Sequence, residues 1–307
     1  MDSKLYILKR TALAVLTVWL VITVTFFVMR AVPGGPFAGE KAISPEALAA
    51  LEEKYGLDKP LLVQYGTYLK DIVTRLDFGP SLKQRDRSVL QIIREGLQVS
   101  AGLGLTAAAL AVATGLSLGT VAALARGKWA DKAIMVLTTG FVSMPSFIIG
   151  TLLLLLFAVK WMVVPANGTV AGGLILPVVT LSMYPAAYIT RLTRSAMLEV
   201  MGQDYIRTAK AKGVSGFRLV TVHALKNALL PVITYLGPML AHIVTGSLVV
   251  EQIFAVPGIG RSFVVSITNR DYPLIMGTTI VLSVLIVVMN LLSDLLYKAA
   301  DPRIELR

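Results

Sequence analysis

The sequence contains no cysteine and only two histidines, His223 and His242. Disulfides, thiolate metal sites and a cysteine nucleophile are therefore excluded, and two histidines are too few for a His-based metal site. The only Gly-Lys pair, Gly127-Lys128, is followed by Trp129, so the phosphate-binding string G-x-x-x-x-G-K-[ST] is absent. Neither a cofactor nor a metal is expected in this chain.

Charge is also scarce, at 15% of the 307 residues, whereas 55% are hydrophobic. The mean hydropathy of +0.73 is far above that of a soluble chain. Four segments expected to face the cytoplasm hold 16 Lys or Arg against 6 Asp or Glu, within a total net charge of +11; they are residues 1–10, 125–132, 191–231 and 298–307. Positive charge gathered on one side is typical of a membrane protein and not of a nucleic-acid binder.

Six uncharged runs are long enough to cross a bilayer as helices. A retained span is favoured over a signal peptide for the first run, because Arg30 stands where a small-residue cleavage site would be. We expect an all-α integral membrane protein, a single transmembrane domain over 1–307, with both termini in the cytoplasm. The expected spans are Thr11–Met29, Gly96–Ala125, Ala133–Val159, Gly173–Thr190, Asn227–Val250 and Tyr272–Ser293.

Residues 31–97 form the one large polar excursion, and their 9 basic and 9 acidic residues leave the segment neutral, so it can lie outside the membrane. Ser44-Pro45-Glu46 predicts a helix start. Apolar residues at three- and four-residue spacing predict an amphipathic helix over Leu62–Leu76, and Val89, Ile92 and Ile93 suggest another short one. A solvated cap and a contact surface for a binding protein both remain open for this excursion.

Small residues and prolines interrupt several spans. Gly115 and Gly119 have the G-x-x-x-G spacing that lets helix backbones approach each other. Helix kinks are expected at Pro145, Pro177, Pro185, Gly237 and Pro238.

The most informative polar segment is Asp204–Pro231, which is basic and carries glycines between long hydrophobic runs. Asp204 can cap a short helix over Tyr205–Lys212, and Gly213 suits the left-handed residue that ends it. A second helix is expected over about Phe217–Leu230. A helix of two turns is marginal in isolation, so we expect it to dock on a soluble partner.

The residues of this segment resemble the cytoplasmic EAA loop of ABC-importer permeases, and in particular the peptide and nickel branch of that family. The matching strings are Tyr205–Gly213 and His223–Pro231. Arg207 and Lys226 replace the Glu and the later Pro of the general EAA pattern, and the peptide branch has the same replacements. The resemblance implies a type I ABC-importer permease fold and a coupling helix that sits in a groove of an ATPase subunit. The coupling residues would be Asp204, Tyr205, Ile206, Arg207, Ala209, Lys210, Ala211, Lys212 and Gly213.

A second string of this family, Val249–Gly260, contains Glu251 at the predicted outer end of the fifth span. Pro257, Gly258 and Gly260 predict a tight turn there. We hypothesise that Glu251 holds this turn through backbone N–H groups and shapes an outer gate. An ordinary interfacial cap is the alternative.

The resemblance implies a permease subunit of an ATP-driven importer in the bacterial inner membrane. Its partners would be a second, non-identical permease subunit, two ATP-binding subunits that hold the ATP and Mg²⁺, and an extracytoplasmic substrate-binding protein. The strings Val32–Phe37 and Leu76–Leu82 resemble the oligopeptide members. Dipeptides, glutathione and nickel complexes remain possible substrates within the branch. An ion-coupled secondary transporter is the rival from another class, although the spans offer few of the carboxylates it requires.

Overall fold

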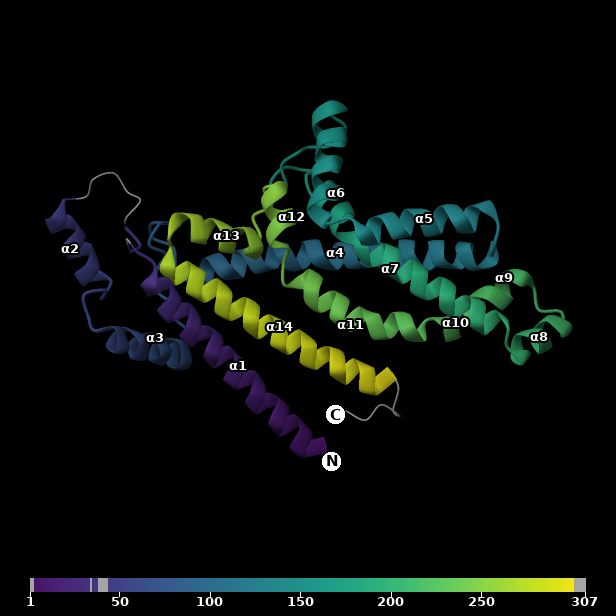
Figure 1. Ribbon diagram of the computed structural model, residues 1–307, viewed down its shortest axis with the longest axis horizontal. Helices are drawn as coiled ribbons and strands as arrows, with labels where there is room; N and C mark the ends of the chain where they lie inside the picture. The colour runs from purple at the N-terminus through teal and green to yellow at the C-terminus, as the bar shows by residue number, and fades with distance from the viewer. Residues whose placement is uncertain (1–2, 34, 38–43, 301–307) are drawn as a thin grey trace. The chain divides into compact units, whose positions relative to one another are not determined.

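The computed structural model describes residues 3–33, 35–37 and 44–300, and these residues are mostly helical, with no strand (Figure 1). They divide into two compact units, residues 1–98 with 258–285 and residues 99–257 with 286–307. The elements are α1 (Ser3–Ala31), α2 (Pro45–Lys54), α3 (Leu61–Arg75), α4 (Val89–Leu124), α5 (Trp129–Ser143), α6 (Ser146–Leu153), η1 (Leu154–Lys160), α7 (Ile175–Met201), α8 (Asp204–Ala211), α9 (Gly216–Arg218), η2 (Leu219–Ala224), α10 (Leu225–Ala228), α11 (Leu230–Val244), α12 (Leu248–Ile253), α13 (Ile259–Asn269) and α14 (Tyr272–Ala300).

Five helical segments are long and apolar enough to cross a membrane, and a sixth span results if the bent pair α5 and α6–η1 counts as one. The five segments are Lys9–Ala31, Val89–Leu124, Ile175–Met201, Leu230–Ile253 and Tyr272–Leu292. The six-span expectation therefore agrees with the structure when the bent pair is counted once. The helices alone do not distinguish the two sides of a membrane, so the cytoplasmic placement of the termini stays a prediction.

The third expected span, Ala133–Val159, is not one straight helix. It breaks at Met144 and Pro145, and the segments on either side meet at 108°. Met144 is extended because the ring of the following proline disfavours a helical conformation at the preceding residue. Figure 1 shows the result: α6 points in a different direction from α5, and both helices contact α7.

The other prolines behave differently. Pro177 lies in the first turn of α7, where its missing N–H breaks no intrahelical bond, so the structure gives no reason for a kink there. Pro185 and Pro238 lie inside α7 and α11, and both helices continue through them. A bend at Pro185 or at Gly237-Pro238 stays a prediction.

The glycine pair of α4 makes the close helix contact that its spacing predicts. A Cβ atom built on Gly115 would lie 2.7 Å from Cβ of Ile189, and one on Gly119 would lie 2.6 Å from Cβ of Thr193. Both neighbours belong to α7, so α4 and α7 approach each other through these glycines. The same stretch also reads G-x-S-x-G, but Ser117 is exposed in mid-helix and its hydroxyl donates to the carbonyl of Ala113, 2.7 Å away. It is therefore not the strand-to-helix elbow of a hydrolase.

The polar excursion contains the two helices that its sequence predicts. Ser44 caps α2, and its hydroxyl accepts from the N–H of Ala47 at 3.3 Å, with proline at the first helical position. The predicted amphipathic helix is α3. Val89, Ile92 and Ile93 do not form a separate short helix; they are the buried first turn of α4, because they pack into the apolar core of the first unit with α1, α3 and α14.

Candidate functional site

The segment Asp204–Ala228, called the helical hairpin below, begins with α8. This helix starts one residue earlier than expected, since Gln203 is the N-cap and Asp204 lies in the first turn. The negative side chain of Asp204 is still favourable there, close to the positive end of the helix dipole. The helix ends as expected: Gly213 has φ of +77°, a conformation in which a side chain would be strained.

One face of α8 packs against its own chain. Ile206 is only 2% exposed and Ala209 is also buried. They belong to an apolar cluster with Met197 of α7 and with residues of the second half of the hairpin, Leu219, Ala224 and Ala228. The expectation that Ile206 and Ala209 contact a partner is therefore not supported by their placement, because both side chains already support the hairpin itself.

The other face of α8 is open and basic. Tyr205, Arg207, Lys210, Ala211 and Lys212 are all exposed. The 3.5 Å ion pair between Arg207 and Asp204 is itself in solvent and contributes little to the stability of the helix.

The second half of the hairpin starts with Phe217, whose side chain is 83% exposed. Phe217 lies in α9, and the chain continues through a π-helical turn (η2) and α10, so the single helix expected over Phe217–Leu230 is irregular. The amide of Asn227 donates to the hydroxyl of Tyr205 at 2.8 Å and joins the two halves. The hairpin is therefore a folded surface with a large exposed aromatic and several cations, and sequence reasoning missed both Phe217 and the Asn227 contact.

An ion pair fixes the helix that leads into the hairpin. Arg194 of α7 donates to both carboxylate oxygens of Asp131, at 2.6 and 2.8 Å, and the N–H of Gly127 donates to Asp131 at 2.9 Å. This bidentate geometry ties the first turn of α5 to α7, and the Gly127 bond adds the loop between α4 and α5. Sequence reasoning missed this pair, whose members are 63 positions apart. The only signal for it is that they carry opposite charges in two predicted cytoplasmic segments.

Glu251 is completely buried. The hydroxyl of Ser100 on α4 donates to its carboxyl oxygen at 2.6 Å, and the N–H of Ser247 donates to the same oxygen at 3.3 Å. In return, the hydroxyl of Ser247 accepts from the N–H of Val250 at 3.2 Å, which caps α12. Glu251 thus joins the start of α12 to α4. Its action on the turn near Pro257 and its gating role stay predictions; in that turn Gly258 is the N-cap of α13, and Gly260 already lies in the helix.

Replacing Glu251 with alanine is expected to lower the free energy of unfolding by about 1–3 kcal/mol, because a buried hydrogen-bonding group loses its partner. Chemical unfolding in detergent measures this change, and the exposed neighbour Gln252, replaced by alanine, is the control. A double-mutant cycle with Ser100→Ala isolates the bond. Additive effects of the two substitutions would contradict it, and unchanged transport and ATPase activity in Glu251→Gln would contradict the gating role.

These features define an all-helical, multi-span membrane protein with an exposed basic hairpin. A family profile described as "Binding-protein-dependent transport system inner membrane component" matches residues 115–306, and the corresponding N-terminal profile matches residues 4–87. The chain belongs to this family, as the strings in the hairpin indicate.

Curated relatives match along almost the whole chain. The dipeptide transport system permease protein DppB of Bacillus subtilis is 48% identical over 302 residues, which cover 98% of each chain. The oligopeptide transport system permease protein OppB of Escherichia coli K12 is 43% identical over 304 residues, covering 98% of this chain and 99% of that relative.

A solved structure of the MetNI methionine ABC transporter in inward-facing conformations matches 69% of this chain and 97% of the solved chain, with a TM-score of 0.54 and 18% identity. An amino acid ABC transporter matches 68% of this chain and 94% of its own, also with a TM-score of 0.54 and with 15% identity. These likenesses establish the ABC-transporter permease fold that the sequence predicts.

Proposed function

We propose that the chain is one permease subunit of an ATP-driven, binding-protein-dependent peptide importer of the bacterial inner membrane. The observation that carries the proposal is the helical hairpin: a buried apolar face holds it on α7, while a basic face with Phe217 is left open. Aromatic residues and arginine are enriched in protein–protein interfaces, and Phe217 and Arg207 are both exposed on this surface. In a chain of this family, a soluble ATPase subunit is the partner that fits such a surface.

The assembly would contain a second, non-identical permease subunit, two ATP-binding subunits that carry the nucleotide and Mg²⁺, and an extracytoplasmic substrate-binding protein. ATP-driven closure of the ATPase pair would move the hairpin, and α7 would carry that movement into the bundle. The Asp131–Arg194 ion pair supports such a rigid connection, since it holds α7 to the first turn of α5. Alternating access of the pathway follows from this movement.

Peptides are the proposed substrate, because the relatives at 43–48% identity are named for oligopeptide and dipeptide transport. The strings in residues 31–97 favour oligopeptides, whereas the relative at 48% identity favours dipeptides. Competition between dialanine, trialanine and tetra-alanine for uptake distinguishes the two.

The direct test is uptake of labelled trialanine into proteoliposomes that contain this chain, its partner permease and the ATPase subunits. Uptake is expected to require ATP and the binding protein and to be unaffected when ionophores collapse the ion gradients. A complex in which an ATPase subunit has lost its catalytic base is the control. Uptake driven by an ion gradient without ATP would contradict the proposal and favour a secondary transporter.

A further inference from the structure

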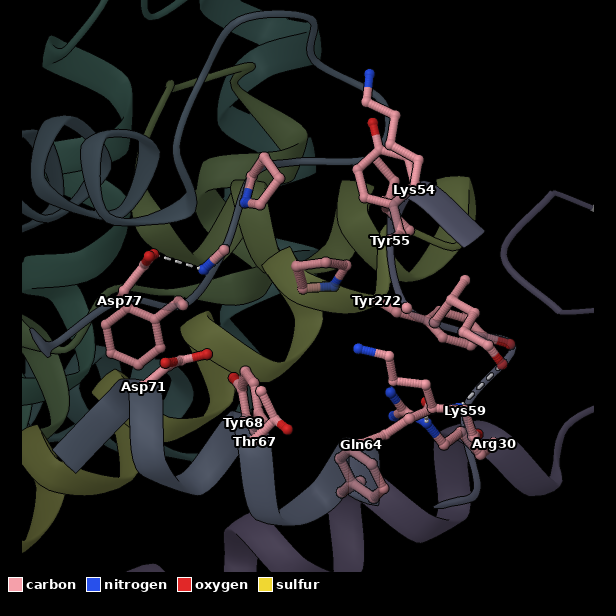
Figure 2. A pocket seen from close by; sticks show the side chains of 18 of the residues that line it. Arg30, Lys54, Tyr55, Lys59, Gln64, Thr67, Tyr68, Asp71, Asp77 and Tyr272 are labelled. Carbon is pink, nitrogen blue, oxygen red and sulfur yellow. Dashed lines mark hydrogen bonds between the residues drawn. The ribbon is translucent and has the colours of Figure 1, made fainter. Parts of the chain in front are cut away.

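A second feature of the molecule is a pocket in the first unit, and no residue of the helical hairpin lines it. It has a volume of about 400 Å³, within the range of small-molecule sites. Its walls come from the end of α1, the loop between α2 and α3, α3 itself, the segment after α3 and the start of α14 (Figure 2). All of these belong to one compact unit.

The guanidinium of Arg30 lines this pocket and is held in place by its neighbours. Its Cζ lies 3.6 Å from the ring centroid of Phe26, and its Nε donates to the side-chain oxygen of Gln64 at 2.9 Å. The amide nitrogen of Gln64 donates in turn to the carbonyls of Leu57 and Lys59, at 3.0 and 2.7 Å. Gln64 therefore connects Arg30 to the backbone of the α2–α3 loop and fixes the direction of the guanidinium.

The two terminal nitrogens of Arg30 have no acceptor among the residues that the structure describes, and no carboxylate of those residues forms an ion pair with it. A partly buried cation with unused donors requires an anion or water. The hydroxyl of Tyr68 is also enclosed without a partner in the described chain, and burial raises its pKa, so it stays a neutral donor. A fixed guanidinium offers the planar pair of N–H groups that suits a carboxylate.

Charged side chains of both signs line the pocket: Arg30, Lys54 and Lys59 are basic, and Glu53, Asp71 and Asp77 are acidic. Figure 2 shows Lys59 and Gln64 beside Arg30, whereas Asp71 and Asp77 lie on the opposite side. A ligand with a carboxylate at one end and an ammonium at the other would meet opposite charges at both ends. An acidic side chain of a protein would satisfy only the Arg30 end.

We propose that this pocket is a carboxylate-binding site anchored by Arg30, and that a short peptide with free termini is its occupant. The choice of a peptide rests on the proposed function, whereas the carboxylate chemistry does not. An aspartate or glutamate side chain of the substrate-binding protein is the other source of the same group.

The test is calorimetric binding of trialanine, its C-terminal amide and its N-acetyl form to the complete transporter in nanodiscs. Trialanine is expected to bind at least ten-fold more tightly than the amide, and the N-acetyl form is expected to be weakened as well. Arg30→Gln is expected to weaken trialanine at least ten-fold and to remove the preference over the amide. Lys70→Gln removes an exposed cation from α3 outside the pocket and is the matched control.

The two possible sources of the carboxylate, a peptide and the substrate-binding protein, give different results. If Arg30→Gln leaves trialanine binding unchanged but weakens docking of the purified binding protein at least ten-fold, the carboxylate belongs to that protein and the peptide assignment is wrong. If neither changes, the site itself is refuted. Arg30→Lys, which keeps the charge, and thermal unfolding of each variant separate a lost site from a misfolded unit. If the wild-type transporter takes up trialanine but trialanine does not bind at this pocket, only this inference is wrong. If there is no ATP-driven uptake at all, the proposed function is wrong.

Discussion

Replacing Ala211 with glutamate is expected to reduce binding-protein-stimulated ATP hydrolysis and peptide uptake at least ten-fold. Ala211 lies on the exposed face of α8, outside the apolar cluster that holds the hairpin. A larger, negative side chain there leaves the hairpin folded but obstructs close approach of a partner. Burying an unpaired carboxylate in an interface is costly enough to weaken binding by this factor.

Two control substitutions separate loss of the partner contact from loss of the folded hairpin. Ala209→Glu places the same charge inside the hairpin cluster, so it is expected to unfold the hairpin and to prevent assembly with the ATPase. Ala50→Glu changes an exposed alanine of α2 and is expected to leave hydrolysis and uptake near the wild-type values. All three variants are compared by co-purification with the ATPase, which measures assembly, by limited proteolysis, which measures folding of the hairpin, and by coupled ATPase assays. Normal coupling in an assembled Ala211→Glu complex would falsify the assignment of the hairpin as the coupling element.

The second large effect concerns the contact of α4 with α7. Gly119→Ala is expected to lower the free energy of unfolding by about 1–3 kcal/mol, because the added methyl group would overlap side-chain and backbone atoms of α7. The distances are 2.6 Å to Cβ of Thr193 and 2.7 Å to the carbonyl oxygen of Thr190. A backbone atom cannot move aside as the end of a flexible side chain can.

The same helix supplies the control for this substitution. A methyl group added to Gly102 would have no neighbouring atom within 4 Å, and alanine is a better helix former than glycine by about 1 kcal/mol. Gly102→Ala is therefore expected to be neutral or stabilising. Unfolding in detergent, followed by helical circular dichroism, compares the two variants. Equal stability of Gly119→Ala and Gly102→Ala would show that α4 and α7 are not in close contact at Gly119.

The elements with strong local signals were predictable. The caps of α2 and α8 were placed within one residue, because a serine before proline and a glycine at positive φ act through the adjacent backbone alone. Long uncharged runs predicted the spans for a similar reason: crossing a bilayer requires about 20 consecutive apolar residues, whatever the tertiary contacts are. The strings of the hairpin also identified the family correctly.

Predictions that depended on a distant neighbour were less successful. The bend between α5 and α6 was expected only as a kink at Pro145, yet the two segments meet at 108°. The predicted coupling residues of α8 include Ile206 and Ala209, although both side chains pack on the chain itself. A single amphipathic turn cannot reveal which of two surfaces covers its apolar side, since both would select the same residues.

The sequence by itself determined the class of protein, the approximate spans and the position of the basic hairpin, because hydropathy, charge and turn chemistry are properties of short segments. Only the tertiary structure decided which side of the hairpin is free, that Asp131 pairs with Arg194, and that Gln64 orients Arg30 toward a pocket. Each of these joins residues that lie on separate helices. The energy of such contacts depends on distances of a few ångströms, which are set by the packing of whole helices and are not encoded in any local pattern.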